Sequence, residues 1–237
     1  MATRLIGVGV GPGSPDLLTI RALRRLREAD VIFAPTMAAD VQGRAESIVL
    51  QADSGLVIRR LVFAIIRDEA ARAEAHRAAA QAVHAELALG RSVAFITLGD
   101  PNVYSTFHHL VRHVRQLDPE VDVETVPGIM AFQALASEAS VLVTDDVETL
   151  RIVTGVNGVD DIAVALDDPS ATVVVYKGGR HVKAIVDLLQ CRDRLAGAVF
   201  GELLGLEGSV IAPLTDVSAE SVAYLSTIIV PPQRSAP

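Results

Sequence analysis

Short apolar runs alternate with longer amphipathic stretches through the first half of the chain. A short apolar run bounded by turn residues is typical of a buried strand, and apolar positions three and four residues apart are typical of a helix. The resulting alternation of strands and helices predicts a mainly parallel sheet with helices on both faces. The predicted strands are Leu5–Val10, Val31–Ala34, Leu56–Val62, Val93–Thr97 and Val121–Val126, and the predicted helices are Asp16–Glu28, Arg44–Ala52, Asp68–Leu89 and Val103–Gln116.

The second half of the chain has a different order. Helices and strands alternate as far as Leu189, and three strand-like runs then follow with no helix between them. Short connections between successive strands favour antiparallel pairing, so we expect a mixed second sheet. The sequence therefore predicts two α/β domains, residues 1–120 and 121–237. The predicted elements are helices Ile129–Glu138, Asp160–Leu166 and Val182–Leu189, and strands Leu150–Thr154, Thr172–Tyr176, Ala198–Leu203, Ser209–Ala212 and Val222–Val230.

Composition narrows the class of protein. The 237 residues carry a formal net charge of −8, which argues against a nucleic-acid binder that relies on a broad basic surface. The single cysteine, Cys191, rules out an internal disulfide and fits a reducing cytosol. No apolar run reaches the roughly 18 residues of a membrane helix, and the first strand begins too early for a signal peptide. We expect a cytoplasmic protein that binds neither membranes nor nucleic acid.

Three loops that follow predicted strand ends are rich in glycine and proline. The first, GVGVGPGSPDLLT from Gly7, is close to a dinucleotide-binding fingerprint, but Pro12 replaces a glycine and removes a backbone N–H that a phosphate needs. Ser14 and Pro15 predict the start of the next helix. The other two loops are residues 98–107 and 126–131. Because ligands of open α/β sheets bind beyond the carboxyl ends of strands, we expect a small ligand other than NAD where these loops converge.

These motifs, in this order and spacing, resemble the tetrapyrrole methylase family over essentially the whole chain. The matching stretches are GVGVGPGSPDLLT, ADVIF from Ala29, GDPNVYSTF from Gly99, VPGI from Val126 and KGGR from Lys177. The resemblance implies two α/β domains with S-adenosylmethionine between them, and we expect a homodimer. Within the family, GDPNVYSTF and the Lys-Gly-Gly-Arg turn most resemble the enzymes that methylate C20 of precorrin-2 in vitamin B12 synthesis.

Transferred position by position, the resemblance implies a cofactor pocket in which backbone groups grip the methyl donor. Asp100 either accepts a hydrogen bond from the donor's amino group or caps the helix near Tyr104. Methyl transfer depends on positioning, and an electron-rich reduced tetrapyrrole needs no nucleophilic side chain, so no catalytic residue is assigned. The implied residues are Pro12, Leu98, Gly99, Asp100, Val103, Tyr104, Ser105, Thr106, Met130 and Ala131, with Lys177 or Tyr176, Gly201 and Thr227 on the side of the second domain.

A local group of cations follows the strand that ends near Tyr176. Lys177, Arg180 and His181 are close in sequence, in a chain whose net charge is −8. Because a precorrin carries many carboxylates, we expect these residues, together with Arg44, to bind the substrate. The alternative is a solvated first helical turn. His109 and His113 have the spacing of metal ligands on a helix, but without cysteine or Glu-x-x partners we expect an ordinary helix surface and no metal.

Two departures from the family pattern bear on the substrate. Pro35 stands where members that methylate uroporphyrinogen III carry an acid, which argues against that substrate. Met130 and Ala131 replace a small hydroxyl residue found in many members, which leaves a backbone contact to the donor at that point.

The alternatives to methylation of metal-free precorrin-2 are a cobalt-bearing factor II substrate, a relative that methylates RNA or a protein side chain, and a ligand-sensing module without catalysis. Glu202 is a candidate for the group that accepts the proton.

Overall fold

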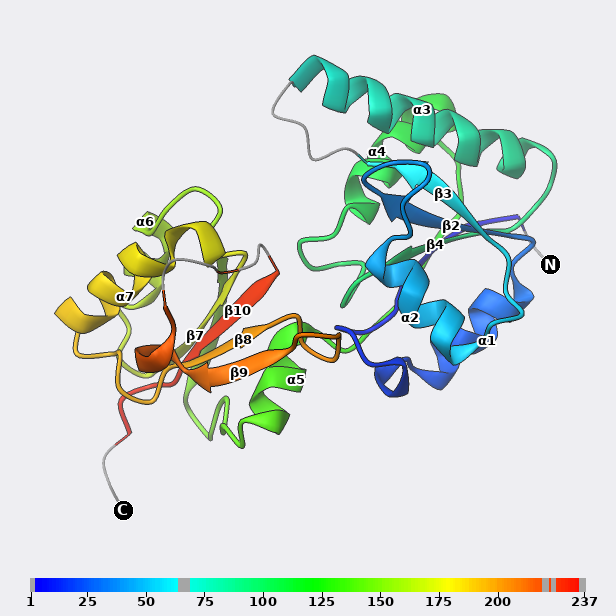
Figure 1. The fold of residues 1–237 in the computed structure, drawn as a ribbon. Coiled ribbons are helices and arrows are strands. Elements are labelled where there is room, and N and C mark those ends of the chain that lie inside the picture. The colour runs from blue at the N-terminus through cyan, green and yellow to red at the C-terminus, as the bar shows by residue number, and fades with distance from the viewer. Residues whose placement is uncertain (1–2, 64–68, 219–221, 223–224, 235–237) are drawn as a thin grey trace. The chain divides into compact units, whose positions relative to one another are not determined.

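The computed structural model describes residues 3–63, 69–218, 222 and 225–234, and the chain divides into two compact units, Met1–Met130 and Ala131–Pro237. Figure 1 shows both units. Asp68, the first residue of one predicted helix, lies outside the described residues.

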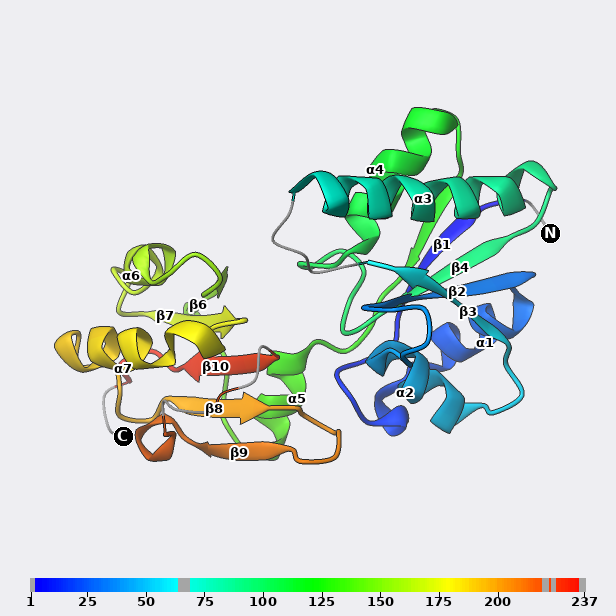
Figure 2. The same cartoon turned by 45° about the horizontal axis from the view of Figure 1, so that its top comes forward.

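The first unit is a five-stranded sheet of order β3-β2-β4-β1-β5 in which every neighbouring pair is parallel. Helices α1 and α2 lie on one face of this sheet and α3 and α4 on the other, as Figure 2 shows. The apolar side chains of each pair of helices pack in the core on their own face. Both faces of the central strands are therefore buried. The strands are β1 Leu5–Gly9, β2 Val31–Thr36, β3 Ile58–Val62, β4 Val93–Thr97 and β5 Val123–Val126, and the helices are α1 Ile20–Glu28, α2 Arg44–Ala52, α3 Glu69–Ala88 and α4 Phe107–Leu117, with a 3₁₀ turn η1 at Pro15–Leu17.

The second unit is a mixed five-stranded sheet of order β6-β7-β10-β8-β9. Only β6 and β7 are parallel, and the remaining pairs are antiparallel. Helices α6 and α7 pack against a core that contains Phe200 and Ile228, while Leu135 of α5 packs against Gly201 of β8. The elements are α5 Ala131–Glu138, β6 Thr149–Thr154, α6 Asp160–Ala165, β7 Ala171–Tyr176, η2 Gly179–His181, α7 Val182–Cys191, β8 Val199–Glu202, β9 Val210–Pro213, η3 Leu214–Asp216 and β10 Ser226–Val230.

The predicted fold class, with a mainly parallel first sheet and a mixed second sheet, is confirmed. The position of one strand differs from the expected domain division. The strand Val123–Val126 pairs in parallel with β1 and so belongs to the first sheet, which places the division after Met130 rather than after residue 120. The first strand gains a second neighbour in this way, and its apolar residues are completely buried.

Two helices of the first unit begin four residues later than the sequence indicates. Ser14 caps only the 3₁₀ turn η1, and Thr19 caps α1 through a hydrogen bond from the Ala22 N–H. The fourth helix begins at Phe107 instead of Val103, because Tyr104 has a φ of 47° and interrupts helical geometry.

Candidate functional site

Three loops of the first unit meet backbone to backbone at the carboxyl end of the sheet. Gly11 and Gly99 form an isolated antiparallel bridge, in which the Gly99 N–H donates to the Gly11 carbonyl at 2.8 Å. A Cβ added to Gly9 would lie 2.5 Å from the Gly99 oxygen and 2.7 Å from the Gly128 nitrogen. The loops after β1, β4 and β5 therefore approach so closely that only glycine fits at their crossing.

Asp100 ties the loop after β4 to the loop after β5. Its Oδ1 accepts from the Asn102 N–H at 2.8 Å, and its Oδ2 accepts from the Gly128 N–H at 3.1 Å. The Asn102 side chain donates in turn to the Thr125 hydroxyl at 3.3 Å. The helix after this loop does not use Asp100 as a cap, since the Phe107 N–H donates to the Ser105 hydroxyl at 3.1 Å. Asp100 orders the backbone at the place where the sequence predicts the methyl donor.

The same loop presents an exposed, strained tyrosine. Tyr104 has a positive φ of 47°, which is costly for a bulky residue, and its side chain is 48% exposed. The hydroxyls of Thr97 and Ser105 lie 3.0 Å apart and hold the loop to the end of β4. Backbone strain in a well-anchored loop is common at ligand sites. Around this loop, Pro12 is buried and Leu98, Gly99, Val103, Thr106 and Met130 are half-buried.

The residues predicted in the second unit fall into one row across its sheet. Tyr176 of β7 pairs with Thr227 of β10, and Thr227 pairs with Gly201 of β8. The start of α5 lies against this row, because the Phe132 N–H donates to the Tyr176 hydroxyl at 3.2 Å and a Cβ on Gly201 would meet Leu135. Ala131, the first residue of α5, is half-buried. The pairing register thus collects residues that are distant in sequence.

Lys177 follows this row in a left-handed backbone conformation. Its φ is 58°, and its N–H donates to the Ser226 carbonyl at 3.0 Å. Burial lowers the pKa of the Lys177 amine below its ordinary value. Arg180 is exposed and His181 is half-buried in η2, just before α7. Arg44, the fourth predicted substrate residue, is exposed at the first position of α2 and belongs to the other unit.

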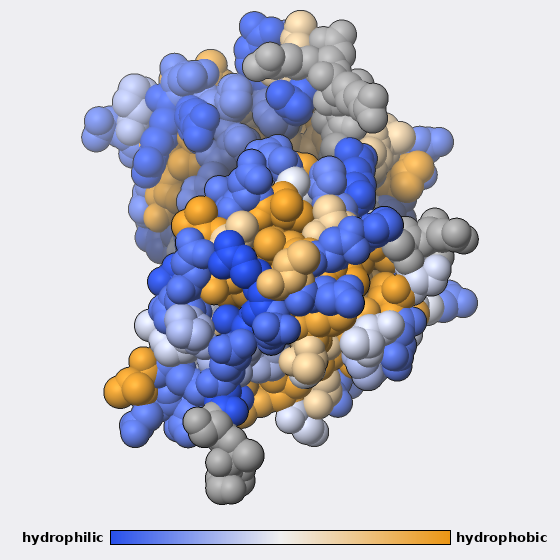
Figure 3. Space-filling view, turned by 90° about the vertical axis from the view of Figure 1, so that its left-hand side faces the viewer, coloured by the Kyte–Doolittle hydropathy of each residue, from blue (hydrophilic) through white to orange (hydrophobic). Residues whose placement is uncertain are grey.

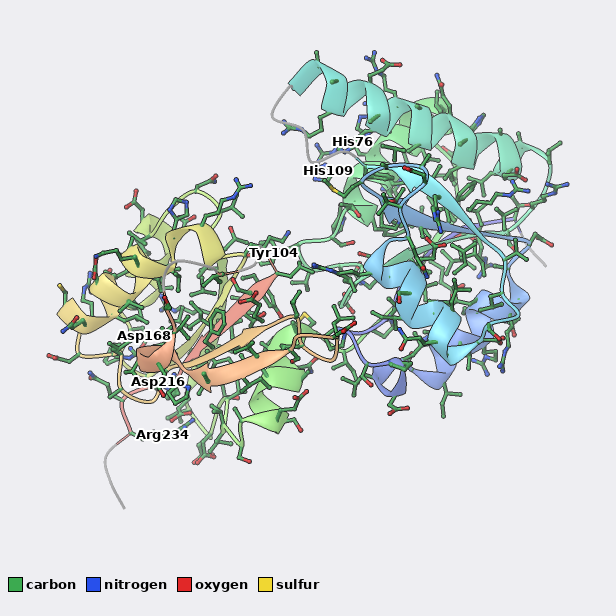
Figure 4. All side chains as sticks on the ribbon, viewed as in Figure 1. His76, Tyr104, His109, Asp168, Asp216 and Arg234 are labelled. Carbon is green, nitrogen blue, oxygen red and sulfur yellow. The ribbon has the colours of Figure 1, made fainter. Side chains whose placement is uncertain are left out.

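The structure also brings together histidines that the sequence left on an ordinary helix surface. His76 of α3 lies with its ring centroid 5.5 Å from that of His109 and 5.7 Å from that of His113, both on α4. Figure 4 shows His76 and His109 beside each other. The i, i+4 spacing of His109 and His113 on α4 can be read from the sequence. The sequence does not indicate that the third imidazole, from another helix, lies beside them. Among the described residues, no group of three or more histidine, cysteine, aspartate or glutamate side chains has an arrangement that suits a metal ion.

Within the described parts of the chain, no helix combines the length and apolar character needed to span a bilayer.

Comparison with known proteins gives a consistent family. The model of the family described as Tetrapyrrole (Corrin/Porphyrin) Methylases matches residues 4–217. A Sinorhizobium protein named precorrin-2 C(20)-methyltransferase is 33% identical, covering 99% of this chain and 97% of that protein. A Salmonella typhimurium protein named cobalt-precorrin-2 C(20)-methyltransferase is 32% identical over 81% of this chain and 82% of its own length. Among solved structures, the uroporphyrin-III C-methyltransferase of Thermus thermophilus, complexed with S-adenosyl homocysteine, is 26% identical with a TM-score of 0.66, covering 96% of this chain and 92% of that one.

Proposed function

The chain belongs to the tetrapyrrole (corrin/porphyrin) methylases, and from this membership we propose that it transfers a methyl group from S-adenosylmethionine to C20 of precorrin-2. The observation that carries the proposal is the similarity, along nearly the full length of both chains, to the relative named precorrin-2 C(20)-methyltransferase. In the reaction the S–CH₃ bond breaks, a C–CH₃ bond forms at C20, and C20 loses its proton. The products are precorrin-3A and S-adenosylhomocysteine.

The close approach of Gly9, Gly99 and Gly128, which we call the glycine crossing, supports S-adenosylmethionine as the donor. Its close backbone contacts bring three loops together at the same end of the sheet, where backbone amides and carbonyls can bind adenine, ribose hydroxyls and the amino-acid end of the donor. The Thermus relative, solved with S-adenosyl homocysteine, supports the same donor. When bound, the donor supplies an electrophilic methyl group. We assign its binding in the first unit to Pro12, Leu98, Gly99, Asp100, Val103, Tyr104, Ser105, Thr106 and Met130, and in the second unit to Ala131, Tyr176 or Lys177, Gly201 and Thr227.

The task of these residues is positioning. The carbon that attacks is already electron-rich, so the protein has to hold it in line with the methyl group and keep water away. The bonds from Asn102 and Gly128 to Asp100 fix the loop for this purpose. Arg44, Lys177, Arg180 and His181 are proposed to bind the substrate carboxylates, since cationic side chains form charge-assisted hydrogen bonds with carboxylates.

The decisive experiment incubates the protein with S-adenosylmethionine and enzymatically generated precorrin-2 under anaerobic conditions. We expect one added methyl group by mass spectrometry. A parallel incubation with the cobalt-bearing substrate tests the second candidate, which the similarity to the Salmonella protein favours. Methylation of the cobalt form alone would replace the metal-free substrate in the proposal. Binding of both ligands without any methyl gain would instead indicate a sensing module, and methylation of RNA or protein alone would reassign the substrate class.

A matched pair of variants tests the donor site. Asp100→Ala should weaken S-adenosylhomocysteine binding by about tenfold or more, because it frees two backbone N–H groups of the loop. Asp118→Ala is the control, since Asp118 accepts from the N–H of Glu120 in the same kind of turn after α4. Isothermal calorimetry measures both. Equal losses in the two variants would contradict the assignment of Asp100.

Dimerisation and a cytoplasmic location complete the proposal. Large apolar side chains are exposed on the second unit, with Val147 at 89% and Val164 at 65%. Figure 3 shows apolar side chains gathered among polar ones on the face that it displays. Exposed apolar patches of this kind mark contact surfaces. Light scattering should give twice the mass of one 25.1 kDa chain, and a monomer at micromolar concentration would remove this part of the proposal.

A further inference from the structure

A group of cationic and imidazole side chains lies between α3 and α4, apart from the residues assigned above. The His76 ring lies near those of His109 and His113, and it also lies near the Phe63 ring, with centroids 5.1 Å apart. Arg72 of α3 and Arg112 of α4 are exposed and near enough for their charges to act on these imidazoles. We call Arg72, His76, His109 and Arg112 the α3–α4 cationic cluster.

The charges in this cluster have one sign. Burial is the main cause of the lowered pKa of His76, and His109, His113 and Arg72 lower it further. Burial likewise leads for His109, followed by Arg112, His113, His108 and Arg72. Within the described residues, neither arginine forms an ion pair with a carboxylate, and the Glu74 side chain of α3 is paired with Arg77 at 2.6 Å. Among the described side chains, the charge of this cluster is therefore positive, in a chain whose net charge is −8.

Helix stability does not account for this arrangement. His109 and Arg112 lie in the first two turns of α4, where the helix dipole disfavours cations and favours anions. Arg72 is the fourth residue of α3, and His76 is the eighth. Since α3 follows β3 and α4 follows β4, both helix starts lie at the carboxyl end of the parallel sheet, the end that carries Tyr104 and the glycine crossing. Positive charge that pairs with no carboxylate of the described residues, placed at the ligand-binding end of a sheet, is an arrangement that attracts an anionic ligand.

We propose that the α3–α4 cationic cluster binds the acetate and propionate carboxylates of the tetrapyrrole substrate. This inference rests on the proposed function and adds a set of substrate residues to Arg44, Lys177, Arg180 and His181. Arginine suits a carboxylate because its planar guanidinium donates two parallel hydrogen bonds. The imidazoles add donors when protonated, so an approaching carboxylate favours their charged form. The ring of Phe63 and the stacked imidazoles limit how far the cluster can rearrange.

The test compares Arg112→Ala with Arg115→Ala, which removes an exposed arginine of α4 three residues further along the same helix. Arg112→Ala should raise the KM for precorrin-2 by about tenfold, as expected for one charge-assisted contact, with the dissociation constant of S-adenosylhomocysteine unchanged. Arg115→Ala should leave both values at those of the unmodified protein. Arg72→Ala should behave like Arg112→Ala, and thermal unfolding of all three variants shows whether the fold is intact.

A second comparison uses pH. Precorrin-2 should bind more tightly as the pH falls from about 8 to about 6, because protonated imidazoles attract carboxylates. His76→Gln should flatten this dependence, whereas His84→Gln, two turns further along α3, should preserve it. Methyl transfer with an unchanged KM in both Arg72→Ala and Arg112→Ala would overturn this inference while leaving the proposed function in place. Absence of methyl transfer by the unmodified protein would overturn the proposed function first, and this inference with it.

Discussion

Single atoms decide the geometry of the glycine crossing. A Cβ on Gly128 would collide with the Gly99 carbonyl and lie 2.9 Å from Gly9 Cα, so backbone would have to move. We expect Gly128→Ala to lower the free energy of unfolding by about 2 kcal/mol and to weaken S-adenosylhomocysteine binding more than tenfold. The control is Gly55→Ala, whose added Cβ would meet only the Asp53 side chain, at 3.3 Å. Urea unfolding and calorimetry measure the two effects. Equal changes in the free energy of unfolding and in binding for both variants would show that the three loops can move apart without loss.

His76 gives a residue-scale prediction for pH. Its folded-state pKa is lowered, chiefly by burial, so the unfolded chain takes up a proton at a higher pH than the folded one. Stability is therefore fully present above the ordinary histidine pKa of about 6.5 and is lost as the pH falls through the lower folded value. His76→Gln should reduce the loss of melting temperature between about pH 7 and pH 5. His84→Gln should keep the full loss, and identical curves for the two variants would contradict the role of His76.

At the scale of elements, the sequence predicts the bounds of a helix or strand where neighbouring residues alone determine them. The helix Arg44–Ala52 and the strand Val93–Thr97 have the predicted bounds, because apolar periodicity and turn residues mark both ends. Pairing across the chain was harder. The sequence predicts the strand at Val123–Val126, but its partner β1 lies more than a hundred residues away, and no local feature identifies β1 as the partner. The sequence shows the spacing of the α4 histidines, whereas the contact of His76 on α3 with His109 is seen only in the structure.

An element-scale prediction concerns the pair that joins α2 to β3. Glu46 is almost completely buried, and its two oxygens accept from Arg60 at 2.8 and 3.0 Å. Glu46→Ala leaves the guanidinium without this partner, and because Arg60 is 30% exposed we expect a cost of about 2 kcal/mol, less than for a fully buried pair. Glu74→Ala, which breaks an exposed pair with Arg77, should cost under about 0.5 kcal/mol. Chemical denaturation measures the free energy of unfolding of both variants, and equal losses would contradict this prediction.

At the scale of the whole molecule, the sequence names the residues that we propose for the site but not how they are arranged. The motifs at Gly99 and Val126 identified the loops, yet the crossing of Gly9, Gly99 and Gly128 and the Tyr176–Thr227–Gly201 row depend on strand register. Register follows from pairings between distant segments, which a single sequence does not display. The roles proposed for these residues require both units to bind the same ligand, and this requirement can be tested without assuming how the units are placed.

S-adenosylhomocysteine should slow amide hydrogen exchange in both units. In the first unit we expect protection of the loop residues 98–106, and in the second of the segment around Lys177, whose N–H donates to Ser226. Binding to the folded state also raises the melting temperature, and at a hundred times the dissociation constant the gain is about 2.7 kcal/mol. Amides of α6, which carries none of the residues assigned to the donor, serve as the internal reference and should gain less protection than these two segments. Protection confined to residues 98–106 would contradict the assignment of Tyr176, Lys177, Gly201 and Thr227, because a ligand held by both units must shield both from solvent.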